Sequence, residues 1–229
     1  MQKERKNDKN KSHTDIFSRK RRMKYFKEYI EGSTVLHIGC INHDWRESLK
    51  EEWMHDYIVQ NSKEVLGIDI LEDDIKELRK MGYDIIYANA EDFELNKKFD
   101  IIFAGELIEH LNNLKGFLES CKRHMSNDSL LLISTPNCFG IRHNISNLLG
   151  TTFVNTEHRY WFDYWTLRQL LEYNGFDVVC IDYGLLDRLD KFSKYLAPTN
   201  VLNTTLQCIE YIFPKLAPRL FVVARKKSK

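Results

Sequence analysis

The sequence lacks the features that mark several large classes of protein. Its 229 residues contain no apolar run close to the roughly 20 residues that a membrane-spanning helix needs. The first residues hold no apolar stretch of the kind found in secretory signals. The five cysteines are widely spaced and form no Cys-x-x-Cys pair, which argues against a zinc site built from them. We therefore expect a cytoplasmic protein with reduced thiols.

Net charge is also nearly absent, at +1, whereas proteins that bind nucleic acid through bulk charge are usually far more basic. The distribution is uneven. Residues 1–28 contain eleven Lys and Arg against four Asp and Glu, and the rest of the chain is mildly acidic. We expect a disordered basic lead over residues 1–17. A helix over residues 18–30 should follow, with its basic residues in solvent and Met23, Phe26 and Ile30 on one apolar face.

From residue 33 onward, short apolar runs alternate with segments of helical spacing. The helical segments are residues 73–82, 112–124 and 166–175. The expected strands are 34–38, 64–70, 84–88, 99–104, 129–134, 176–183 and 219–225. Near-continuous apolar strands between helices indicate an α/β fold with a mostly parallel sheet covered on both faces. The last two strands have no helix of their own between them, which indicates an antiparallel pair at one edge.

In such a sheet, ligands bind beyond the carboxyl ends of the strands. Gly39 follows the first strand and lets the backbone turn sharply. Asp69 ends the second strand, where an acid can accept hydrogen bonds from ribose hydroxyls. A turn glycine followed by an acid at the next strand end indicates a nucleoside-binding crevice.

Five motifs in this order resemble the class I S-adenosylmethionine-dependent methyltransferases. They are Val35-Leu-His-Ile-Gly-Cys40, Val65-Leu-Gly-Ile-Asp69, Ala88-Asn-Ala-Glu-Asp92, Phe99-Asp-Ile-Ile-Phe-Ala-Gly-Glu-Leu-Ile-Glu-His-Leu111 and Leu131-Leu-Ile-Ser-Thr-Pro-Asn137. The resemblance covers roughly residues 30–183. It implies a Rossmann-like, seven-stranded sheet with strand order 3-2-1-4-5-7-6 and S-adenosylmethionine as the cofactor.

The resemblance also implies which residues bind that cofactor. Gly39 and Cys40 match the loop beside its methionine part, and Asp69, with Ile70 next to it, matches the ribose-binding acid. Asn89 and Ala90 match the pair that faces the adenine edge. Gly105 and Glu106 match the pair beneath the methionine and sulfonium.

Two departures from the family pattern lie in the first motif. His37 stands where the family usually has Asp, and Gly39-Cys-Ile-Asn-His43 replaces the usual Gly-Cys-Gly-x-Gly. The missing glycines also argue against a dinucleotide site. These two departures are the only support for a different possibility, a non-catalytic binding protein that retains the crevice.

On the acceptor side, Glu106, His110 and His158 are the candidate catalytic residues. An oxygen acceptor can require a general base, and histidine suits that role near neutral pH. In the alternative interpretation, Glu106, Glu109 and His110 bind a divalent metal, with a later histidine completing the site. That spacing resembles small-RNA 3′-end 2′-O-methyltransferases. We expect no metal, because many metal-free methyltransferases also carry Glu-His-Leu at this place.

Residues 138–165 are expected to form a lid over the crevice, with Arg142 or Arg159 available for a phosphate or carboxylate. The run from Glu157 to Asp163 resembles methyltransferases of bacterial glycan biosynthesis. We therefore expect O-methylation of a sugar or other small polar acceptor, on a free small molecule or a glycan.

The remaining expectations concern domain organisation and surfaces. Residues 18–229 should form one domain, with a cofactor-binding core over 30–137 and a terminal helix and hairpin over 166–229. Apolar residues within 199–223 beside the basic end of the chain raise the possibility of a membrane-surface contact. We favour a core-covering helix and the last strand for this segment.

Overall fold

One sheet of seven strands, in the order β3-β2-β1-β4-β5-β7-β6, carries the fold. The strands are β1 (Thr34–Ile38), β2 (Glu64–Asp69), β3 (Ile85–Tyr87), β4 (Phe99–Gly105), β5 (Met125–Pro136), β6 (Phe176–Tyr183) and β7 (Arg219–Lys226). β7 lies between β5 and β6 and runs antiparallel to both, whereas the pairs among β1 to β5 are parallel. The predicted fold class and strand order are confirmed.

The computed structural model describes residues 22–49, 53–150, 155–184 and 201–227, with the backbone alone for residues 201–204. The expected disordered lead, residues 1–17, lies outside the described residues. The helical elements are residues 22–30, α2 (Trp45–Ser48), α3 (Met54–Asn61), α4 (Glu72–Lys80), η1 (Ile108–His110), α5 (Leu114–Arg123), α6 (Ile141–Leu148), α7 (Tyr164–Tyr173), α8 (Val201–Ile212) and η4 (Pro214–Leu216).

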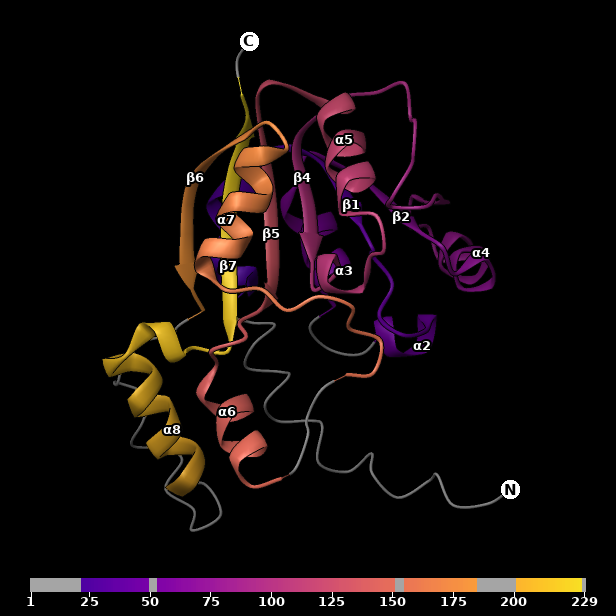
Figure 1. Ribbon diagram of the computed structural model, residues 1–229. Coiled ribbons are helices and arrows are strands. Elements are labelled where there is room, and N and C mark those ends of the chain that lie inside the picture. Colours follow the sequence, from indigo (N-terminus) through magenta and orange to yellow (C-terminus); the bar gives the residue numbers. More distant parts are fainter. Residues whose placement is uncertain (1–21, 50–52, 151–154, 185–200, 228–229) are drawn as a thin grey trace.

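Helices cover both faces of the sheet and make three layers (Figure 1). Because side chains alternate along a strand, Leu36 and Ile38 pack toward α5 and α7, whereas Val35 packs toward α3 and the helix of residues 22–30. On that helix, Met23, Phe26 and Ile30 are buried as predicted. The apolar strands are therefore buried on both faces, as their sequences indicated.

The helices α4, α5 and α7 begin within two residues of their predicted starts. α7 begins two residues early because Asp163 caps it: its carboxylate accepts hydrogen bonds from the backbone N–H groups of Trp165 and Thr166. The sequence did not predict the short helices α2, α3 and α6. Their few residues give too little periodicity to separate them from loops.

The helices α6 and α8 lie beyond the carboxyl ends of the parallel strands, whereas β7 ends, with Arg225 and Lys226, at the opposite end of the sheet (Figure 1). Leu220 and Phe221 are buried in β7, whereas Ile212 and Phe213 are exposed. The apolar segment and the basic terminus therefore do not form one face, so the structure does not support the membrane-surface arrangement considered from the sequence. Among the described residues, no helix is both long and apolar enough to cross a membrane.

Two buried histidines, His37 of β1 and His55 of α3, face each other with their Nδ1 atoms 3.1 Å apart. Burial lowers the pKa of His55 to about 4. Burial is the main cause that holds the pKa of His37 well below its ordinary value, and the neighbouring His55 and Arg22 lower it further. One neutral ring can donate to the other through these Nδ1 atoms, so this contact needs no charge on either ring. His37 thus packs here as a neutral residue where the family usually has an acid.

We expect this pair to make the stability of the protein depend on pH. Both rings stay neutral in the folded state, whereas in the unfolded chain they take up protons below about pH 6.5. Stability should therefore be complete above pH 6.5 and fall as the pH drops toward 4, by roughly 3 kcal/mol for His55. Urea unfolding at pH 7, 6 and 5 measures this fall. An equal fall in a His55→Gln variant would contradict the assignment.

Candidate active site

The residues predicted to bind the cofactor follow neighbouring strands at one edge of the sheet. In register, Ile38 lies beside Ile68 and Ala104, so the ends of β1, β2 and β4 coincide. Gly39, Asp69 and Gly105 are consequently brought together. Because β1 is also the point where the strand order reverses, this edge is where an open α/β sheet binds its ligand.

The loop after β1 keeps a sharp turn although two of the family's glycines are missing. Gly39 has φ +67°, and a Cβ there would lie 2.9 Å from the Leu107 Cδ1 atom. His43, in place of the last glycine of the family motif, also has a positive φ of 44°. A non-glycine residue in this conformation is uncommon, and its neighbours must hold it there.

Asp69 provides the bond that holds this loop. Its Oδ2 atom accepts from the Ile41 backbone N–H at 2.9 Å, and its Oδ1 atom accepts from Ile70 and Leu71 at 2.7 and 3.2 Å. Burial raises the pKa of Asp69, and these backbone donors oppose the rise. The predicted ribose-binding acid therefore also joins the end of β2 to the glycine loop.

Three other predicted contacts have different surroundings. The Cys40 thiol is buried, which raises its pKa, and the Cys40 carbonyl accepts from the Trp53 Nε1–H at 2.7 Å. Ala90 packs in the core, whereas Ile70 is 60% exposed at the strand edge. Cys40 is thus mainly a packing residue, and Ile70 presents an apolar surface suited to the flat face of a base.

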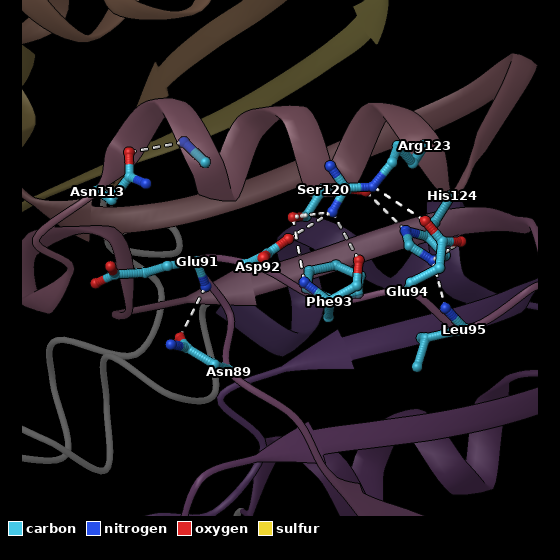
Figure 2. A network of polar contacts seen from close by, with 11 residues as sticks. Asn89, Glu91, Asp92, Phe93, Glu94, Leu95, Asn113, Ser120, Arg123 and His124 are labelled. Atoms are coloured by element: carbon cyan, nitrogen blue, oxygen red, sulfur yellow. Dashed lines mark hydrogen bonds and ion pairs between the residues drawn. The ribbon is translucent and has the colours of Figure 1, made fainter.

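A polar network fixes the loop that follows β3, which contains the predicted adenine-facing residues (Figure 2). The Asn89 side chain accepts from the Glu91 backbone N–H within this loop. Arg123, at the end of α5, forms an ion pair with Asp92 at 3.0 Å and donates to the Phe93 carbonyl. His124 accepts from the Leu95 N–H at 2.9 Å. The loop is therefore anchored to α5 from one side.

Glu106 is held by two arginines that the sequence analysis did not identify. Its Oε2 atom lies 2.8 Å from Arg219 Nε, and its Oε1 atom lies 3.7 Å from an Arg22 nitrogen and 3.0 Å from Ser134 Oγ. Burial would raise the pKa of Glu106, but the charges of Arg219 and Arg22 hold it below its usual value. Glu106 is a fixed carboxylate, poorly suited to accept a proton.

Both arginines come from distant segments of the chain. Arg22 lies on the helix of residues 22–30 and is 8% exposed, so this member of the basic run is buried rather than solvated. Arg219 opens β7, more than 100 residues after Glu106. No local signal in the sequence connects either arginine with Glu106, and only the packing of the helix and the insertion of β7 do so.

A second cluster adjoins Glu106 and consists of Glu109, His110 and His158. One ligand-type atom from each residue lies within 4.8 Å of the other two, and the rings of His110 and His158 are 4.7 Å apart. Burial, followed by the charge of Glu106, raises the pKa of Glu109 to about 8. Burial lowers the pKa of both histidines. The structure thus brings together two of the three predicted catalytic residues, with Glu109 between them and Glu106.

The segment that carries His158 is tied to the cluster through its backbone. The N–H groups of Arg159 and Tyr160 both donate to the Glu109 carbonyl, at 2.7 and 3.2 Å. Phe162 is buried, and its carbonyl accepts from the Cys138 N–H at 2.9 Å. Residues 158–162 of the predicted lid are therefore joined to η1 and to Cys138 after β5.

Arg142 does not fit its predicted role. Its Nε atom lies 3.0 Å from Glu210, whose side chain is almost completely buried, so it joins α6 to α8. The guanidinium is committed to a structural ion pair instead of being available for a phosphate or carboxylate. Arg159, the other residue considered, is exposed. Tyr160 and Trp161 are also partly exposed beside the cluster.

Comparison with known proteins identifies the family. A family model described as a methyltransferase domain matches residues 11–181. The chain belongs to this methyltransferase family. The match and the fold confirm the class I S-adenosylmethionine-dependent methyltransferase inferred from the sequence motifs, with S-adenosylmethionine as its cofactor.

Curated relatives of this methyltransferase include two plant enzymes. The (S)-tetrahydroprotoberberine N-methyltransferase of Eschscholzia californica is 26% identical over 118 residues, which are 52% of this chain and 34% of that protein. The (S)-coclaurine N-methyltransferase of Papaver somniferum is 35% identical over 65 residues, 28% of this chain and 18% of that protein. The matches thus span about a third or less of the length of these relatives.

Solved structures share the fold at low sequence identity. A SAM-dependent methyltransferase from Archaeoglobus fulgidus has a TM-score of 0.54 and 23% identity, with 94% of this chain and all of that chain covered. The magnesium protoporphyrin IX methyltransferase from Synechocystis, solved with bound SAH, has a TM-score of 0.60 and 12% identity over 97% and 90% of the two chains. These similarities show the architecture alone.

The edge residues fit the cofactor that the family implies. Gly39 turns without a Cβ, Asp69 ends β2 with its carboxylate at the edge, and Asn89 follows β3. Gly39 thus allows a ligand to approach the backbone closely, Asp69 can accept hydrogen bonds from hydroxyl groups, and Asn89 offers a polar side chain. The contacts of the individual residues with S-adenosylmethionine remain predictions.

Proposed function

We propose that this protein methylates a hydroxyl group of a small polar acceptor, and that the acceptor is a sugar. When bound, S-adenosylmethionine supplies the methyl group as part of a reactive sulfonium. The observation that carries the proposal is the Glu109–His110–His158 cluster, which adjoins Glu106 at the cofactor edge. An enzyme that only aligns an acceptor next to a sulfonium does not need imidazole and carboxyl groups close together beside the acceptor.

A hydroxyl group needs this cluster because its oxygen is a weak nucleophile while it keeps its proton. Imidazole nitrogens and carboxylate oxygens can accept that proton, or accept a hydrogen bond from the hydroxyl group that carries it. His110 and His158 are both partly exposed, so an acceptor can reach them. Glu106, held between two arginines, is suited to a fixed electrostatic role beneath the sulfonium.

The lid supplies the surface that favours a sugar. Tyr160 and Trp161 are 38% and 36% exposed beside His158, and the His158 and Trp161 rings lie 5.8 Å apart. Aromatic faces next to polar groups suit the apolar face and hydroxyl edge of a sugar ring. The Tyr160 hydroxyl donates to the Asn112 carbonyl at 3.2 Å, which holds this surface against the segment after β4.

An amine acceptor is the second candidate, because both curated relatives described above are named N-methyltransferases. An amine without its extra proton already carries a lone pair, so it depends less on groups that activate a hydroxyl. A cluster placed to act on an O–H group therefore favours oxygen over nitrogen.

A matched pair of acceptors tests this choice. Purified protein with S-adenosylmethionine labelled in its methyl group should be offered sugar glycosides and, in parallel, the same sugars with one hydroxyl replaced by an amine. We expect the labelled methyl group on an oxygen of the sugar, as a methyl ether located by mass spectrometry. Transfer to the amino sugars alone, with the label on nitrogen, would replace the sugar hydroxyl by an amine as the acceptor.

A further inference from the structure

We propose that Glu109, His110 and His158 form a binding site for a divalent transition-metal ion. The ligand-type atoms of the three residues all lie within 4.8 Å of one another. Metal–ligand bonds to carboxylate oxygen and imidazole nitrogen are about 2.0–2.2 Å long, so small side-chain rotations bring all three atoms into contact with a single ion. The inference replaces the metal-free expectation drawn from the sequence.

The surroundings of Glu109 and His110 orient them as metal ligands. The Glu109 Oε2 atom accepts from Thr135 Oγ1 at 2.9 Å, which leaves Oε1 for an ion. The His110 ring makes a hydrogen bond with the backbone of Glu157, which commits one ring nitrogen and leaves the other. Such partners behind a ligand are typical of metal sites, because they fix the orientation and tautomer of the ligating group.

His158 provides an independent observation. Its Nδ1 atom is buried and has no hydrogen-bond partner among the residues that the structure describes. An unpaired buried nitrogen is costly, and native proteins rarely keep one. The His158 ring stands edge-on to His110 and Trp161, so it cannot turn freely away from the cluster. A metal ion would supply the partner that this nitrogen lacks.

The scaffold already holds the three ligands in place. Glu109 and His110 are neighbours in η1, and the Glu109 carbonyl accepts from the N–H groups of Arg159 and Tyr160. His158 directly precedes those two residues. The two segments that supply the ligands are thus joined by backbone hydrogen bonds next to the ligands themselves, which gives a preorganised site.

Glu106 is not part of this site, although the sequence grouped it with Glu109 and His110. Its two carboxylate oxygens are occupied by Arg219, Ser134 and Arg22. An ion near Glu106 would also have to approach two guanidinium charges. The ligand set is therefore two imidazoles and one carboxylate.

This ligand set determines the class of ion. Two imidazoles with a carboxylate suit Zn²⁺, Fe²⁺ and similar transition metals, whereas Mg²⁺ prefers oxygen ligands. Three protein ligands leave an open coordination position, as in catalytic zinc sites. If the proposed function holds, this position binds the hydroxyl of the acceptor. The metal site itself rests only on the three residues and their surroundings.

Cobalt provides a direct test, because its visible spectrum reports binding without any turnover. The full-length protein should first be treated with a chelator and then titrated with Co²⁺. We expect one Co²⁺ per chain, displaced by an equal amount of Zn²⁺ but not by a comparable amount of Mg²⁺. A spectrum that shows no saturable Co²⁺ binding would overturn the proposal.

Variants then locate the ion. His110→Ala and His158→Ala should each weaken Co²⁺ binding at least tenfold. His143→Ala is the matched control, because its ring lies 5.2 Å from Trp161 but is not one of the three ligands, and it should bind Co²⁺ like the wild type. Glu106→Gln should also retain binding. Equal losses in the His143 variant, or unchanged binding in both ligand variants, would contradict the site.

Two further measurements separate this inference from the proposed function. Retained affinity for S-adenosylhomocysteine shows that the histidine variants are folded, and thermal unfolding shows it for Glu106→Gln, because Glu106 is itself a predicted cofactor contact. Full methyl transfer by chelator-treated protein that binds no Co²⁺ would overturn the metal site and leave the sugar acceptor in place. Bound Co²⁺ without transfer to any sugar hydroxyl would support the metal site and count against the acceptor.

Discussion

Replacing His110 by alanine should lower the rate of methyl transfer by roughly 10²- to 10⁴-fold. The ring acts on the acceptor hydroxyl either by accepting its proton or by holding the proposed ion. His110 lies in the cluster with Glu109 and His158, four residues after Glu106 in the chain. The substitution removes a group that acts on the hydroxyl, while none of the predicted cofactor contacts is lost.

The measurement pairs steady-state kinetics with calorimetry of S-adenosylhomocysteine binding to the same variant. We expect the loss in turnover and an affinity within twofold of the wild type. A variant that transfers methyl groups within threefold of the wild-type rate would exclude His110 from the chemistry. A parallel loss of S-adenosylhomocysteine affinity would instead place His110 in the cofactor site.

Replacing Asp69 by alanine should weaken the binding of S-adenosylhomocysteine by roughly 10- to 150-fold. This range corresponds to the loss of hydrogen bonds with a charged group, about 1.5–3 kcal/mol. The structure adds a second reason. Asp69 accepts from the backbone N–H groups of Ile41, Ile70 and Leu71, so its removal also releases the glycine loop. We therefore expect lower thermal stability in the same variant.

Two further variants make this result specific. Asp69→Asn keeps one acceptor oxygen and should lie between the wild type and the alanine variant in both affinity and stability. Asp73→Ala, on the neighbouring helix α4, removes an exposed acid that forms an ion pair with Lys76, and it should bind like the wild type. An unchanged affinity in Asp69→Ala would show that this acid does not bind the ribose.

The strands were predictable because their signal is local. Each core strand is a short apolar run between polar segments, and the structure places β1, β2, β4 and β6 within a residue of the expected bounds. β5 begins four residues earlier than expected, at Met125, because its first residues are mostly polar and continue the strand beyond the apolar run. The strand order followed from the family resemblance.

In the candidate site, too, the part that depends on local sequence was predictable and the part that depends on distant contacts was not. The edge predicted to bind the cofactor could be assembled from the sequence because Gly39, Asp69 and Gly105 stand at the ends of strands that lie side by side in the sheet. The acceptor side depends on a contact between η1 and the segment of His158, nearly 50 residues later in the chain. The sequence could suggest that a later histidine joins Glu109 and His110, but that this histidine is His158 depends on backbone hydrogen bonds that no spacing predicts.

The sequence by itself determined the fold class, the strand order through its motifs, and which residues follow the ends of the strands, because apolar runs and strand-end residues are local properties. Only the tertiary structure decided that Arg22 and Arg219 fix Glu106, and that His158 joins Glu109 and His110. The physical reason is that these contacts depend on where an N-terminal helix, a lid and an inserted last strand pack on the sheet.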